Sequence, residues 1–184
     1  MPFRALLEKL GRILDESGIP YMIIGGQAVL IYGEPRLTRD IDITLGIGVE
    51  EIQRVLDVAS RLGLKILVED ADDFARRTMV LPALDEKTGI RVDFIFSFTP
   101  YERQAIERAN RVKLGDVAVN FASVEDVIIH KVIAGRPRDI EDAKTILLKN
   151  PDYDSEYIVG WLEEFDRALK GGFLDVFRRL VESL

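Results

Sequence analysis

Three aspartates lie in runs of the sequence that otherwise look like buried strands. Asp40 and Asp42 alternate with isoleucine in RDIDITLG (39–46), and Asp93 lies inside the apolar run RVDFIF. Strands are depleted in aspartate, and carboxylates that share a strand face repel each other and resist burial. These residues therefore need compensation from a bound cation or, in the alternative interpretation, simple exposure to solvent.

The spacing of Asp40 and Asp42 suits metal-assisted phosphoryl chemistry. Side chains two residues apart on a strand share a face, so the two Cα atoms should lie roughly 6.5–7 Å apart. Both carboxylates can then converge on one or two divalent cations. Two-metal sites hold their ions about 3.5–4 Å apart, so that they clamp the attacking and leaving oxygens of phosphoryl or nucleotidyl transfer. A third carboxylate usually completes such a site, and Asp93 is the candidate.

A glycine pair, Gly25 and Gly26, follows the apolar run PYMII and precedes QAVLIYG. Glycine lets a backbone approach a ligand closely, and amides at the start of a helix suit an anion such as a triphosphate. A plain turn between a strand and a helix is the alternative interpretation of the pair.

The residue types limit the kind of metal that the chain can hold. Its 184 residues include no cysteine and one histidine, which excludes disulfides, thiolate sites and a histidine-rich zinc site. Any metal must be held mainly by oxygen atoms, which points to Mg²⁺ or Mn²⁺.

The charge and hydropathy of the chain limit its partners. A net charge of −7 argues against a protein that coats nucleic acid non-specifically, although a local basic patch stays possible, built from Arg36, Arg39, Arg136 and Arg138. No apolar run approaches the roughly 18 residues that span a bilayer, and the N-terminus lacks the apolar core of a signal peptide. We therefore expect a cytoplasmic protein without a membrane partner. The high Glu, Lys and Arg content without cysteine is compatible with a thermophilic source.

Hydrophobic periodicity predicts the elements that position these residues. We expect helices at 3–17, 27–33, 49–62, 70–77, 100–109, 123–135, 136–150, 154–172 and 173–184, strands at 20–26, 39–46, 64–68, 78–85 and 90–97, and a hairpin at 112–122. Strands and helices alternate at first, and helices alone follow. The prediction is an α/β (α+β) fold with a core over residues 1–122 and a helical C-terminal region over 123–184 packed on that core.

Three motifs together resemble a known superfamily. These are GG at 25–26, DID at 40–42 and VDF at 92–94, and as a set they resemble the DNA polymerase β-like nucleotidyltransferases. The surrounding pattern looks closer to one subgroup, the small bacterial and archaeal proteins related to the toxins of abortive-infection type IV toxin–antitoxin systems. The resemblance covers the α/β core and extends into 123–149. It implies a nucleotidyltransferase-type mixed β-sheet flanked by helices, with a helical C-terminal part.

The resemblance also implies roles for the motif residues. Asp40 and Asp42 would bind both of two metal ions, Mg²⁺ or Mn²⁺. Asp93 would bind the catalytic metal and help to activate the incoming hydroxyl. Gly25 and Gly26 would contact the triphosphate of an NTP.

Further nucleotide-binding candidates flank these motifs. Thr38 shares the face of Asp40 if the strand begins early, and Arg39 either neutralises phosphate or pairs with the acidic cluster. Lys131 is carried over from the subgroup as a phosphate-binding residue, and Asp139 would orient Lys131 or a ligand. Asp142, on the same helical face as Asp139, is a weaker candidate. The alternatives are that Asp139 complements a helix dipole and that Lys131 is merely solvated.

The predicted function is metal-dependent transfer of a nucleoside monophosphate from an NTP to a hydroxyl acceptor, RNA or a small molecule, with release of pyrophosphate. The alternative is a non-catalytic nucleotide-binding protein or toxin–antitoxin component of the same fold. A structural protein whose C-terminal helices pair is a third hypothesis. A homodimer and an antitoxin-type protein partner both stay open.

Overall fold

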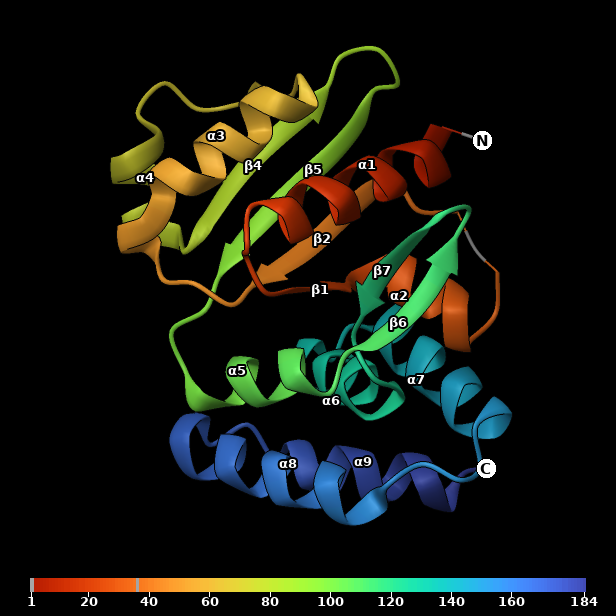
Figure 1. Ribbon diagram of the computed structural model, residues 1–184. Coiled ribbons are helices and arrows are strands. Elements are labelled where there is room, and N and C mark those ends of the chain that lie inside the picture. Colours follow the sequence, from red (N-terminus) through yellow and green to blue (C-terminus); the bar gives the residue numbers. More distant parts are fainter. Residues whose placement is uncertain (1, 36) are drawn as a thin grey trace. The chain divides into compact units, whose positions relative to one another are not determined.

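The structure is a computed structural model that describes residues 2–35 and 37–184 (Figure 1). Its helices are α1 (Pro2–Glu16), α2 (Gly25–Tyr32), α3 (Ile52–Leu62), α4 (Ala71–Thr78), α5 (Pro100–Glu107), α6 (Val124–Ala134), α7 (Pro137–Lys149), α8 (Ser155–Leu169) and α9 (Phe173–Glu182), with a 3₁₀ turn η1 (Val49–Glu51). Its strands are β1 (Tyr21–Ile24), β2 (Asp40–Leu45), β3 (Lys65–Ile66), β4 (Val80–Asp85), β5 (Ile90–Phe96), β6 (Asn110–Leu114) and β7 (Val117–Phe121).

The strands form one seven-stranded mixed sheet in the order β3-β4-β5-β2-β1-β7-β6. Strand β2 runs parallel to β5 and β1 parallel to β7, whereas the other neighbours are antiparallel. Helix α1 packs on β7, and α4 packs on β4. The sheet with its helices confirms the predicted mixed α/β fold.

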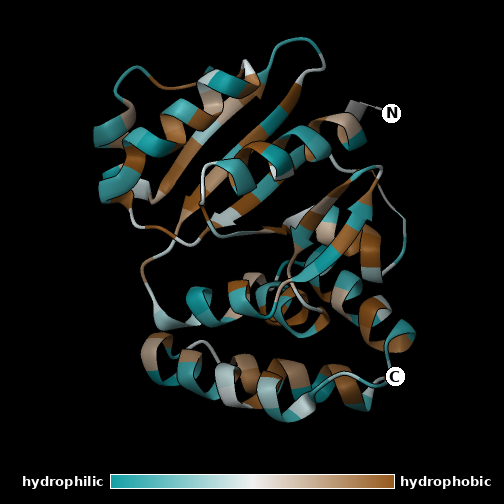
Figure 2. Ribbon diagram, viewed as in Figure 1, coloured by the Kyte–Doolittle hydropathy of each residue, from teal (hydrophilic) through white to brown (hydrophobic). Residues whose placement is uncertain are grey.

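The central strands form because their side chains alternate between two environments. In β2, Ile41 and Ile43 are fully buried, while Asp40 is exposed and Asp42 half-buried. Strand β5 repeats this alternation of buried apolar and more exposed polar side chains. Figure 2 shows hydrophobic residues recurring along β4 and β5. Alternation with a period of two buries one face of each strand and leaves polar groups on the other.

Most of the predicted elements are confirmed, and the differences lie at their ends. Strand β1 stops at Ile24 because Gly25, with φ +63°, already opens α2. The strand predicted at 64–68 shrinks to Lys65–Ile66. The predicted hairpin at 112–122 forms from β6 and β7, and the strands predicted at 78–85 and 90–97 pair as a second hairpin, β4 with β5.

The chain divides into two compact units. Residues 1–27 and 38–121 form the first, which holds the whole sheet, and residues 28–37 and 122–184 form the second. The second unit is built on buried side chains of α6, α7 and α8 such as Ile129, Ile146 and Leu162. The predicted packing of 123–184 on the core stays a prediction.

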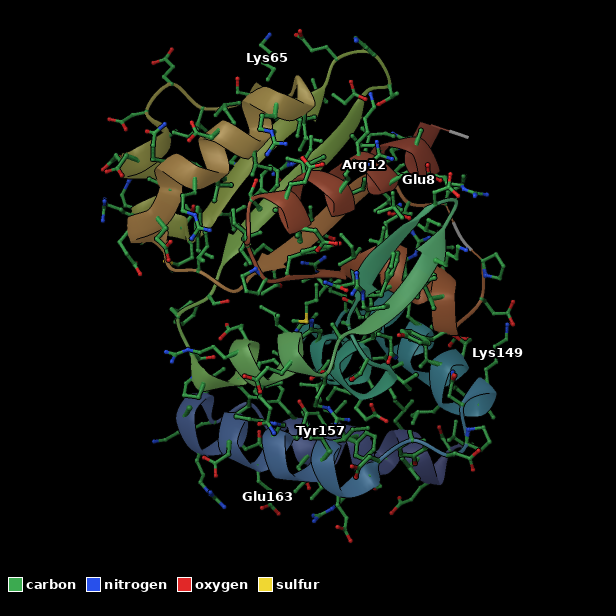
Figure 3. All side chains as sticks on the ribbon, viewed as in Figure 1. Glu8, Arg12, Lys65, Lys149, Tyr157 and Glu163 are labelled. Atoms are coloured by element: carbon green, nitrogen blue, oxygen red, sulfur yellow. The ribbon has the colours of Figure 1, made fainter. Side chains whose placement is uncertain are left out.

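Polar contacts tie segment 28–37 to the helices of the second unit. Lys149, labelled in Figure 3, donates to the carbonyl of Gly33 over 3.0 Å and pairs with Glu34 at 2.7 Å. The side chain of Asn150 donates to the carbonyl of Tyr32 over 3.0 Å. Among the described residues, no helix combines the length and apolar character needed to cross a membrane.

Candidate active site

The pairing of β2 with β5 brings the predicted aspartates together. In this parallel register Asp42 lies opposite Asp93, and Asp40 lies opposite Arg91. Residues directly opposite each other on neighbouring strands point to the same face of the sheet. Asp40 is exposed, and Asp42 and Asp93 are half-buried. The three carboxylates thus share one face of the pair of strands, together with Arg91 and Thr44.

A guanidinium group lies within this acidic cluster. Nε of Arg91 donates to Oδ1 of Asp93 over 2.8 Å. This hydrogen bond raises the pKa of Arg91 above its ordinary value, and the negative charges of Asp93, Asp40 and Asp42 raise it further. Arg91 was not among the site residues predicted from the sequence. Its place two residues before Asp93 in an alternating strand was the signal that could have found it.

Gly25 leaves room for the carboxylate of Asp42. A Cβ atom at Gly25 would overlap Oδ2 of Asp42 and would lie 3.0 Å from its Cγ. The Asp42 side chain therefore packs against the bare Cα of Gly25 at the N-terminus of α2, where the helix dipole favours negative charge. Gly26, the second residue of the helix, is buried. The predicted contacts of both glycines with a triphosphate stay predictions.

The loop before β2 differs from the expectation for Thr38. Strand β2 begins at Asp40, so the condition of an early strand start is not met and Thr38 lies outside the strand. Its hydroxyl donates to the backbone carbonyl of Asp40, the first residue of β2, over 3.3 Å. Arg39 is exposed, and Arg36 lies outside the described residues. Nucleotide binding by Thr38 and Arg39 stays a prediction.

Lys131 is buried in the second unit, which excludes the interpretation of a solvated lysine. Its side chain is 9% exposed, and its Nζ lies 2.7 Å from Oδ1 of Asp139 and 3.0 Å from Oδ2 of Asp142. Asp139 also sits in the first turn of α7, as its dipole interpretation expects. Asp142 contacts the ammonium as Asp139 does, although the sequence favoured it less. Phosphate binding by Lys131 stays a prediction.

The carboxylate oxygens of the acidic cluster are of the kind that binds a divalent cation, but they are not gathered into a coordination site. Carboxylate oxygens are the ligands that Mg²⁺ and Mn²⁺ prefer, and Arg91 already places a positive charge beside Asp93. Within residues 2–35 and 37–184, no group of three or more Asp, Glu, His or Cys side chains is gathered to hold a metal ion. The side chain of Asp93 is instead hydrogen-bonded to Arg91.

Comparison with known proteins identifies the kind of domain. The family model described as nucleotidyl transferase AbiEii toxin, type IV TA system, matches residues 11–178. No curated protein matches the sequence.

Solved structures share the fold at low sequence identity. ANT(2″)-Ia in complex with adenylyl-2″-tobramycin is 18% identical, with a TM-score of 0.62 over 91% of this chain and 99% of that chain. A nucleotidyltransferase-like protein from Paracoccidioides brasiliensis is 15% identical, with a TM-score of 0.56 over 94% and 92%. A putative nucleotidyltransferase from H. pylori is 14% identical, with a TM-score of 0.52 over 97% and 80%.

Proposed function

We propose that this chain, which belongs to the AbiEii family of nucleotidyl transferase toxins, transfers a nucleoside monophosphate from an NTP to a hydroxyl group with the help of a divalent cation. Family membership confirms the predicted enzyme class and the predicted relation to type IV toxin–antitoxin systems. Our proposal concerns the use of an NTP, the requirement for a metal ion and the hydroxyl acceptor.

The observation that carries the proposal is the register of β2 and β5. It sets Asp42 opposite Asp93, with Asp40 on the same face, and Gly25 lets the Asp42 carboxylate lie at the start of α2. Acidic side chains on adjacent strands beside a glycine-initiated helix are suited to handling a triphosphate and its counter-ion. Three carboxylates on one face repel each other, and Arg91 offsets only part of their charge.

In the proposed reaction, the acceptor hydroxyl oxygen forms a bond to the α-phosphorus of the NTP. The bond between that phosphorus and the oxygen that bridges to the β-phosphorus breaks, and pyrophosphate leaves with the bonding electron pair. Asp93 accepts the hydroxyl proton. The amides of Gly25 and Gly26 hold the phosphates. A divalent cation held by Asp40, Asp42 and Asp93 would supply the positive charge that neutralises the triphosphate.

The proposed acceptor is a hydroxyl of RNA or of a small molecule. One protein with this fold was solved with an adenylylated antibiotic, which supports a small acceptor. Arg138 and Arg136, whose side chain is 83% exposed, stand at the start of α7 and are suited to a nucleic acid backbone. Incubation with an α-phosphate-labelled NTP and either RNA or an aminoglycoside distinguishes the two, because the label moves to the true acceptor.

Calorimetric titration of each of the four NTPs in the presence of Mg²⁺ tests the nucleotide site. We expect binding that requires both the metal and Asp42, so that Asp42→Asn abolishes it. Asp57→Asn is the matched control, because Asp57 is an exposed aspartate on α3 of the same unit and its replacement makes the same change in charge. Thermal unfolding of all three proteins shows whether they are equally folded.

Two results would contradict the proposal in different ways. NTP binding that Asp42→Asn leaves unchanged would overturn the site. Metal-dependent NTP binding without transfer of label to any acceptor would favour the non-catalytic nucleotide-binding alternative. A homodimer and an antitoxin-type partner stay predictions, which light scattering of the chain alone and with a candidate partner would test.

A further inference from the structure

Arg91 is a cationic side chain that the fold places among the three aspartates. It lies opposite Asp40 in the register of β2 and β5 and two residues before Asp93 on the same strand face. Its Nε donates to Oδ1 of Asp93 over 2.8 Å. The charges of Asp40 and Asp42 act on it as well. Arg91 therefore neutralises part of the charge that a metal ion would otherwise have to balance.

The pair of Arg91 with Asp93 is placed where it can open. The Arg91 side chain is 49% exposed and that of Asp93 is 18% exposed. Water solvates the guanidinium of this pair and reaches part of the carboxylate, and an ion pair that is open to water shifts an equilibrium by roughly fivefold or less. The guanidinium can turn into solvent while the aliphatic stem of the arginine stays on the sheet.

A divalent cation and Arg91 make competing demands on Asp93. A carboxylate oxygen that accepts the Nε–H bond of Arg91 has one lone-pair direction fewer for a metal. This fits the finding that the described part of the chain gathers no set of three metal ligands. Resting on the function proposed above, we infer that Arg91 is a positioning residue that competes with the divalent cation for Asp93. Arg91 holds the Asp93 carboxylate on the sheet face until the cation displaces the guanidinium group.

Binding of Mn²⁺ to the nucleotide-free protein tests this inference. Free Mn²⁺ is measured by electron paramagnetic resonance for the wild type, Arg91→Gln and Arg91→Lys. Arg91→Gln removes the competitor and should tighten Mn²⁺ binding by roughly two- to fivefold. Arg91→Lys keeps the charge but loses the planar Nε–H donor, so its affinity should fall between the other two.

Arg76→Gln is the matched control. Arg76 also donates its Nε–H to an aspartate, Asp72 on α4, with Nε 2.7 Å from Oδ2 and 52% of the arginine and 55% of the aspartate side chain exposed. Its replacement makes the same change in charge away from the acidic cluster and should leave Mn²⁺ affinity unchanged.

Nuclear magnetic resonance gives a readout that a general change in charge would not produce. The Nε–H signal of Arg91, identified by its loss in Arg91→Lys, should move toward that of a solvated arginine when Mg²⁺ is added. Thermal unfolding shows whether each variant is folded.

The outcomes separate this inference from the proposed function. Equal Mn²⁺ affinity in the wild type and Arg91→Gln, with an Nε–H signal that Mg²⁺ does not move, overturns the inference and leaves the proposed function standing. Failure of every protein to bind Mn²⁺, with and without NTP, overturns the metal-dependent function and this inference with it.

Discussion

The contact between Gly25 and Asp42 shows how one missing side chain can shape a charged site. Asp42 comes from β2 and Gly25 from the start of α2, and the carboxylate occupies the space that a Cβ would need. The positive φ of Gly25, +63°, independently favours glycine. Two physical demands therefore meet at this residue, namely backbone conformation and room for a charged neighbour.

Replacement of Gly25 by alanine should separate these two demands. Gly25→Ala should lower the free energy of unfolding by about 1–2 kcal/mol, because alanine is strained at this φ. It should also weaken NTP binding by roughly tenfold or more, because the new methyl group pushes the Asp42 carboxylate from its place. Urea unfolding and calorimetric titration with NTP and Mg²⁺ measure the two effects.

Gly63→Ala is the control for the strain alone. Gly63 has φ +71° at the end of α3, and a Cβ there would meet nothing within 4 Å. Gly63→Ala should lower the free energy of unfolding by a similar amount and should leave NTP binding unchanged. If both variants bind NTP like the wild type, the room at Gly25 has no role in the site.

Helices α6 and α7 are joined by a buried ionic cluster of Lys131, Asp139 and Asp142. The ammonium of Lys131 lies within 3.0 Å of both carboxylates. Oδ2 of Asp139 is buried without a hydrogen bond, with Nε of Arg136 3.9 Å away. Burial of these charges is costly, and the cluster is tolerated because the partners compensate each other.

Removal of the lysine should therefore destabilise the protein strongly. Lys131→Met leaves two buried carboxylates without their shared cation and should lower the free energy of unfolding by about 3–5 kcal/mol. Urea unfolding at neutral pH measures the loss. The combined variant Lys131→Met, Asp139→Leu, Asp142→Leu should recover much of it, because it leaves no unpaired charge in the cluster.

Lys65→Met is the matched control for the loss of a lysine ion pair. Lys65, labelled in Figure 3, pairs with Glu86 at 2.9 Å, and their side chains are 61% and 63% exposed. Its replacement should change the free energy of unfolding by less than about 0.5 kcal/mol. An equally small effect of Lys131→Met would show that the two aspartates relax into water and that the cluster contributes little.

In the alkaline range, the free energy of unfolding of the whole protein should depend on pH because of Tyr21. This residue of β1 is fully buried, and its hydroxyl accepts a hydrogen bond from the backbone N–H of Asn120 in β7 over 3.3 Å. Burial raises the pKa of Tyr21 from 10.0 to about 12, although the bond from Asn120 opposes the shift. The folded state therefore favours the protonated phenol more than the unfolded state does.

The free energy of unfolding should consequently fall as the pH rises from 10.0 to about 12. Stabilisation from the raised pKa is complete below the unfolded value and is lost as the pH passes through the folded value. The loss amounts to about 2–3 kcal/mol, since one pKa unit corresponds to about 1.4 kcal/mol. Urea unfolding over this range should show a steeper fall for the wild type than for Tyr21→Phe. If the free energies of unfolding of the wild type and Tyr21→Phe fall in parallel, the assignment to Tyr21 is wrong. Near neutral pH the difference between the two proteins should stay constant, which is the internal control.

Local patterns in the sequence determined the elements and the residue types of the site. Alternation marked β2, an apolar run marked β5, and the glycine pair Gly25 and Gly26 marked the passage from a strand to a helix. These features depend on residues close together in the chain, so they can be recognised in it. The combination of GG, DID and VDF also indicated the nucleotidyltransferase fold, which the family match and the solved structures confirm.

Only the tertiary structure decided which residues meet. Strand register is set by packing between distant segments, and it placed Asp93 opposite Asp42 and Arg91 opposite Asp40. The same kind of packing buried Lys131 between two aspartates and grouped segment 28–37 with the C-terminal helices. A periodic pattern states which face a side chain occupies but not what lies across from it, because that partner is chosen by the burial of the whole chain.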